Sequence, residues 1–96
     1  MIDKGWKKMK LKNGIVQSKV GEDYVVVAMG EAGRNFNGMV RNNATAAFLV
    51  ERMLKETTED ELVASLLEEY EVDEATARRD VKHTIETFRN AGLLDE

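Results

Sequence analysis

The sequence predicts an α+β domain in which a three-stranded antiparallel sheet at residues 15–42 precedes three helices, near residues 44–55, 59–70 and 74–91. Three observations predict this class. The spacing of apolar residues changes from about two to three or four at Asn42-Asn43. Before this junction the connections between strands are too short for crossovers, which favours antiparallel pairing. After it, amphipathic segments follow one another, each with a capping residue at its start. This order of elements is winged-helix-like, an arrangement that serves DNA, protein and peptide binding alike.

Three segments carry the strand signals. Residues 15–20 are a short strand candidate that ends at the turn Gly21-Glu22-Asp23. Residues 24–29, Tyr-Val-Val-Val-Ala-Met, are the strongest strand signal in the chain, and because they are apolar on both faces we expect them to be central. A turn at Gly30–Arg34 leads into the third strand, which begins the stretch Asn35–Leu54 and runs directly into the first helix.

Each helix has a start signal. Asn43 can accept a hydrogen bond from the first turn of the first helix, and Asp73 can do the same for the third. Thr58 with Glu61 three residues later is a capping box for the second helix. Gly92 is expected to end the third helix. The predicted core includes Phe48, Leu66, Val81, Ile85 and Phe88.

The third helix has a basic edge along one side of its apolar stripe. At about 100° per residue the stripe is formed by Ala77, Val81, Thr84, Ile85 and Phe88. Arg78, Lys82 and Arg89 lie on one flank of the stripe, whereas Asp80, Thr87 and Ala91 lie on the other. Two interpretations stay open: a solvated face that is basic by chance, or a contact surface for an acidic partner.

Length and composition predict one domain of ordinary globular character. The 96 residues are 43% apolar and 33% charged. Residues 1–14 are expected to form a basic N-terminal arm, with partial order left open, and residues 15–96 the folded domain. The chain has no apolar run of transmembrane length and no signal-peptide core, so we expect a cytoplasmic protein without membrane contact. The net charge of −4 argues against nucleic acid as the main partner.

Chemistry-bearing clusters are missing from the sequence. The chain has no cysteine, which excludes disulfides, thiolate metal sites and thiol catalysis. His83 is the only histidine and falls on the solvent side of the third helix. The acids at Glu59–Glu61 and Glu68-Glu69 are expected to be helix faces in water, without the burial that tunes a catalytic carboxylate. We therefore expect no enzyme, no metal site and no cofactor.

Several motifs, in this order and spacing, resemble the PqqD-like family, the precursor peptide recognition elements of ribosomally synthesised and modified peptides (RiPPs). The resemblance covers about residues 15 to 95. The chain departs from the family at Asn42, where an apolar residue is usual, and at Val50, where an aromatic residue is common; the second departure suggests a differently filled core. The motifs are Asn35–Val40, Asn43–Leu49, Thr57–Val63, Glu68–Asp73, Ala77–Val81 and Ala91–Leu94.

The resemblance implies a non-catalytic module that recognises the leader of a precursor peptide and presents it to a modifying enzyme, commonly a radical SAM maturase. The leader would add as an extra strand to the backbone of Met39, Val40 and Arg41, and would lie against the third helix. Ile85 would supply an apolar floor for it. A homodimer is left open. The acids of the leader would then be contacted by the basic flank, Arg78, Lys82 and Arg89.

Two other functions compete with this one. A DNA-binding winged-helix regulator would place the cations of the third helix and the lysine-rich arm on phosphates. The net charge of −4 and the acidic second helix argue against it. A purely structural domain that docks on an enzyme without binding a peptide is the third alternative.

Overall fold

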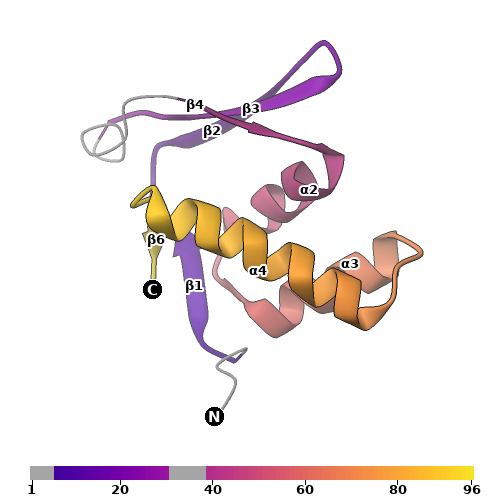
Figure 1. The fold of residues 1–96 in the computed structure, drawn as a ribbon. Coiled ribbons are helices and arrows are strands. Elements are labelled where there is room, and N and C mark those ends of the chain that lie inside the picture. Colours follow the sequence, from indigo (N-terminus) through magenta and orange to yellow (C-terminus); the bar gives the residue numbers. More distant parts are fainter. Residues whose placement is uncertain (1–5, 31–38) are drawn as a thin grey trace.

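The computed structural model describes residues 6–30 and 39–96, and it confirms the predicted α+β class and the order of sheet and helices (Figure 1). The larger sheet is antiparallel with the order β2-β3-β4, so the apolar strand β3 is central as predicted. Residues 31–34 of the predicted turn and the start of the third strand at Asn35 lie outside the described residues. The elements are β2 (Ile15–Val20), β3 (Asp23–Ala28), β4 (Met39–Asn42), α2 (Ala44–Met53), α3 (Glu59–Glu69) and α4 (Glu74–Asn90).

A second, smaller sheet joins segments that are far apart in the sequence, and sequence analysis did not predict it. The strand β1 (Lys8–Leu11) lies between β5 (Thr57–Thr58) and β6 (Leu94–Asp95), and both pairings are antiparallel. Met9 and Leu11 of β1 are 5% and 0% exposed, so this strand contributes to the core. Lys8 is exposed and Lys10 is half-buried, and they alternate with Met9 and Leu11 as the two-residue period of a strand requires.

The predicted helix caps are present. Asn43 Oδ1 accepts from the backbone N–H of Ala46 at 2.8 Å, and Asp73 Oδ1 accepts from that of Thr76 at 2.7 Å. Thr58 Oγ1 accepts from the N–H of Glu61 at 3.1 Å, which is half of the capping box. The carboxylate of Glu61 instead accepts from Thr57 Oγ1 at 3.0 Å. These bonds satisfy donors that the first turn of each helix leaves free.

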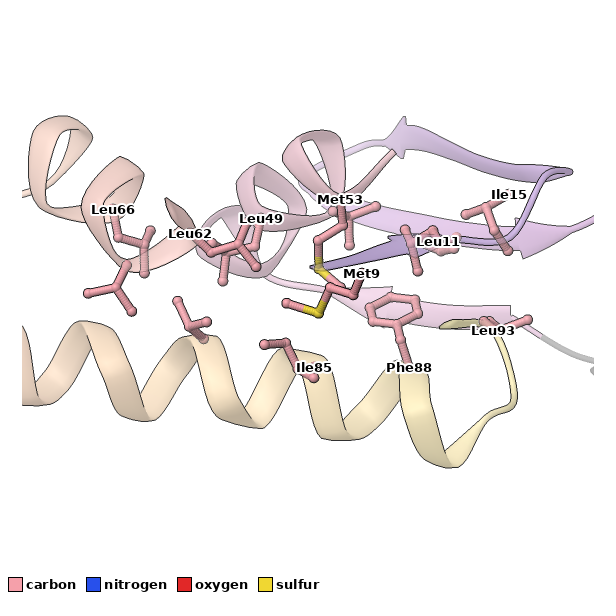
Figure 2. Packing of buried hydrophobic residues seen from close by; sticks show 14 of the residues in the cluster. Met9, Leu11, Ile15, Leu49, Met53, Leu62, Leu66, Ile85, Phe88 and Leu93 are labelled. Atoms are coloured by element: carbon pink, nitrogen blue, oxygen red, sulfur yellow. The ribbon is translucent and has the colours of Figure 1, made fainter. Parts of the chain in front are cut away.

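The core lies between the three helices, β1 and the inner face of the larger sheet (Figure 2). Leu66, Val81, Ile85 and Phe88 are buried as predicted. Phe48 is only partly buried, because α2 directs the adjacent Leu49 and Val50, both 0% exposed, into the core. The ring of Phe48 lies at the rim and meets the ring of Tyr70 edge to face, with 5.7 Å between centroids.

Candidate functional site

Among the described residues, the side of β4 that faces away from β3 is an open edge of the larger sheet. β4 pairs with β3 on one side, with Val40 opposite Val26 and Arg41 opposite Val25. Within residues 6–30 and 39–96, no strand pairs with its other side. An edge strand presents a row of unpaired backbone N–H and C=O groups, which an extended segment from another chain can pair with. The four-residue strand therefore offers a short template for strand addition.

Neighbouring residues of β4 point to opposite faces of the sheet. Val40 packs against the core cluster. Arg41, one residue later, has a side chain that is 75% exposed, and its Nη1 lies 4.0 Å from Oδ2 of Asp23. The side chains of a peptide paired with this edge would therefore point alternately to the inner face, toward the helices, and to the outward face, toward solvent.

A polar hollow lies beside the end of β4. Its volume is about 110 Å³, and it lies between the first turn of α2 and one flank of α4. Because α2 directly follows β4, this is the flank of α4 that faces the strand-helix junction. The lining residues are Asn43, Thr45, Ala46, Asp80, His83 and Thr84.

The basic flank of α4 lies on the other side of that helix. Arg78 Nη1 donates to Glu59 Oε2 at 2.8 Å and to Asp60 Oδ1 at 2.7 Å, both in the first turn of α3. These hydrogen bonds raise the pKa of Arg78 above its ordinary value. The structure therefore turns this guanidinium toward α3 and away from the edge of β4.

Arg89, further along the same flank, is also paired. It donates to the carboxylate of Glu96 at 3.0 and 2.8 Å, and to Glu86 Oε1 at 3.2 Å. The bond to Glu96 raises the pKa of Arg89 and lowers that of the Glu96 carboxyl. Lys82 lies between the two arginines and is exposed, and no ion pair joins it to another residue in the described part of the chain. A peptide contact for these three side chains stays a prediction.

Ile85 is 4% exposed and belongs to the core cluster, where it packs with the other apolar residues of α4 (Figure 2). Its position near the centre of the buried stripe is the physical reason. It therefore presents little surface to a ligand in this structure, and its role as the floor of a peptide site stays a prediction.

A hydrogen-bonded chain that sequence analysis missed holds the end of β4. Asn42 Nδ2 donates to Gln17 Oε1 at 3.1 Å, and Gln17 Nε2 donates to the backbone oxygen of Ala47 at 3.0 Å and to Glu51 Oε1 at 3.3 Å. The side-chain amide of Asn42 thus has a hydrogen-bond partner, at a position where the PqqD-like family usually has an apolar residue. These hydrogen bonds fix β4 against both β2 and α2.

Two further points concern the described residues, namely clusters of metal ligands and membrane-spanning helices. No group of three potential ligands among His, Cys, Asp and Glu could hold a metal ion in residues 6–30 and 39–96. In the same residues no helix is long and apolar enough to cross a membrane. His83 is exposed, as predicted, and lines the polar hollow.

Comparison with known proteins gives a family and two structural neighbours. The family model described as "Coenzyme PQQ synthesis protein D (PqqD)" matches residues 23–94, a range that includes β4 and α4. The chain is similar to "TbiB1 in Complex with the TbiA(beta) Leader Peptide", with a TM-score of 0.69, 20% identity, and coverage of 90% of this chain and 94% of that one. No curated protein matches the sequence.

The second structural neighbour is similar to the same extent. It is "Lasso peptide synthetase B1 complexed with the leader peptide", with a TM-score of 0.68 and 24% identity, and the match covers 92% of this chain and 98% of that one. At these identities the two neighbours show that the fold is shared.

Proposed function

The chain belongs to the PqqD family, and from this premise we propose that it binds the leader of a ribosomally synthesised precursor peptide and presents it to a modifying enzyme. The observation that carries the proposal is the open edge of β4. The two structural neighbours, both complexes with a leader peptide, support it by analogy.

Strand addition is the proposed mode of binding. An extended leader pairs with the backbone of Met39, Val40 and Arg41, and continues the order of the sheet beyond β4. The hydrogen bonds come from the backbone, so affinity does not depend on a reacting side chain. We therefore propose that the module has no catalytic role of its own and acts by positioning the peptide.

The proposed side-chain contacts have less support than the backbone pairing. The sequence pattern favours Arg78, Lys82 and Arg89 as partners for acids of the leader, but the two arginines are held by carboxylates of the chain itself. Lys82 is the member of this flank whose contribution a charge reversal can test without breaking such a pair.

The proposed partners follow from the family. A radical SAM maturase, or another maturation enzyme, would receive the presented peptide, and a cytoplasmic location would bring the module together with newly made precursor. One chain supplies the whole edge of β4, so the proposed mode requires no homodimer.

DNA binding has less support. Arg78 and Arg89 would have to leave Glu59 and Glu96, at 2.8 Å each, before they could contact phosphates. The net charge of −4 also opposes association with a polyanion.

An N-methyl scan of the peptide tests the proposed mode without altering the protein. The probe is the leader of the precursor encoded beside this gene, titrated calorimetrically with one backbone amide methylated at a time. Strand addition predicts that affinity falls at every second position, because alternate N–H groups of a strand face its partner. Uniform loss, or none, would contradict strand addition. Binding of duplex DNA in place of the leader would favour the alternative function.

A proline substitution provides the complementary test on the protein. Val40→Pro removes one backbone donor of β4, and Arg41→Pro removes the next. Since adjacent N–H groups face opposite edges, one variant should lose leader affinity and the other should lose sheet stability. Melting temperatures measured beside the titrations separate the two effects.

A further inference from the structure

We propose that Arg41 selects the bound peptide by pairing with an acidic side chain on the outward face of the sheet. The inference rests on the proposed function, and it names a chemical class of peptide that the backbone pairing alone does not specify.

The register of the sheet places Arg41 on the outward face. Arg41 lies opposite Val25, which lies opposite Ser18, so the three side chains form one row across the sheet. The neighbouring row, with Val40 and the fully buried Val26, faces the core. The row of Arg41 is therefore directed away from the helices, and its side chain is 75% exposed.

An added strand would extend this row by one residue. The peptide residue opposite Arg41 would have its Cβ roughly 5 Å from that of Arg41, on the same face. Opposite charges in such a cross-strand pair stabilise the pairing, and like charges oppose it. This relation holds whether the peptide runs parallel or antiparallel to β4, because in both cases one residue lies beside Arg41.

Arg41 is the only cation among the described strand residues on this face. The others are Val16, Ser18, Val20, Asp23, Val25 and Val27. Its contact with Asp23 is long, at 4.0 Å, and both side chains are well exposed, so little is lost when a peptide acid replaces it. Arg78, in contrast, makes two hydrogen bonds of 2.8 and 2.7 Å. Of the predicted site residues, Arg41 is thus the arginine most available to a peptide.

Selection from a phage-displayed library of random short peptides tests the inference. Wild-type protein, Arg41→Glu and the control Arg79→Glu serve as targets; the control matches in charge change and in exposure, 76% against 75%. Selected peptides are synthesised and their backbone amides are methylated one at a time. Peptides whose affinity falls at every second methylated position are taken to bind by strand addition. We expect them to carry Asp or Glu at one outward position when selected on wild type or Arg79→Glu.

Affinity measurements then test the contact between Arg41 and the acidic residue of the peptide. Arg41→Glu should weaken such a peptide about fivefold or more, Arg79→Glu should leave it unchanged, and a peptide with Lys in place of the acid should regain affinity for Arg41→Glu. Equal affinity for all three proteins would overturn the role of Arg41 and leave strand addition intact. If the wild type selects no strand-adding peptide and binds no leader, the proposed function falls together with the inference.

Discussion

The guanidinium of Arg78 donates a 2.8 Å hydrogen bond to the carboxylate of Glu59, and the two side chains are only 27% and 16% exposed. The same nitrogen reaches Asp60 at 2.7 Å. These bonds join the N-terminal part of α4 to the first turn of α3. A residue that the sequence suggests for ligand binding is therefore engaged in holding two helices together.

Removal of Arg78 should destabilise the fold. Arg78→Ala leaves the Glu59 carboxylate without its charged donor in a partly shielded place, at an expected cost of about 1–3 kcal/mol. Urea denaturation measures this change in the free energy of unfolding. Arg79→Ala is the control, since that side chain is 76% exposed and should change stability by less than about 0.5 kcal/mol. Equal stability of the two variants would contradict the role of the Arg78 bonds.

Truncation of Phe88 should be more severe. The side chain is 1% exposed and lies between α4 and the strand β1 in the core (Figure 2). Phe88→Ala is expected to cost about 3–5 kcal/mol, through lost burial and the cavity that remains. Denaturation by urea, monitored by circular dichroism, gives the value. An unchanged midpoint would show that α4 does not bury this face.

Gly14 should tolerate alanine less well than Gly21. Both have positive φ, 97° and 64°, but a Cβ at Gly14 would collide with the backbone oxygen of Met29, whereas nothing lies near one at Gly21. Gly21→Ala should cost about 1–2 kcal/mol from backbone strain, and Gly14→Ala about 1–3 kcal/mol more because the strands must separate. Melting temperatures of the two variants compare these costs directly. A smaller loss at Gly14 would argue against the close approach to Met29.

The cap at Asp73 should give a pH-dependent contribution to stability. The N–H and hydroxyl of Thr76 lower the pKa of the Asp73 carboxyl below its ordinary value of about 3.9. A lowered folded-state pKa stabilises the protein above about pH 4, and the gain is lost as the pH falls through the folded-state value. Asp73→Ala should therefore lower the melting temperature at neutral pH, with a difference that shrinks in acid. Asp73→Asn, which keeps an acceptor oxygen, is the control; a pH-independent difference for alanine would exclude the ionised cap.

Charge reversal at Lys82 should weaken leader binding modestly. Lys82 is exposed on the flank of α4 that holds Arg78, so we expect a long-range effect of a few-fold that shrinks in high salt. Titration of the leader encoded beside this gene with Lys82→Glu, at low and high salt, measures it. An effect that persists in high salt would instead place the leader in direct contact with this flank.

Sequence alone predicted the larger sheet and the helices because their signals are local. The apolar period changes at Asn42-Asn43, and the caps Asn43, Thr58 and Asp73 stand at the helix starts. The smaller sheet was missed for a physical reason. β5 and β6 have two residues each and carry no period of their own, although the alternation of lysine with Met9 and Leu11 was a usable signal for β1.

The sequence also did not predict the contacts between segments that are far apart in the chain. A helical wheel gives the angle between Arg78 and Asp80 but not which neighbouring element each flank faces. That choice depends on how α3 and α2 pack against α4, which the ion pair to Glu59 and the polar hollow reveal. The bond from Asn42 to Gln17 likewise spans two strands and has no local signal.

The smaller sheet also bears on the order of folding. β1 carries the buried Met9 and Leu11, yet its partner β6 is far away in the sequence, so the pairing of Lys10 with Asp95 closes a long loop. Closing so long a loop has an entropic cost that local pairing avoids, and contacts of this kind slow folding. During synthesis β1 leaves the ribosome before β6, so its pairing with Leu94 and Asp95 has to wait for that segment. The sheet of β2, β3 and β4 joins segments that are close in the sequence and can form before that moment, so the edge that we propose for the peptide can form earlier than the closure by β6.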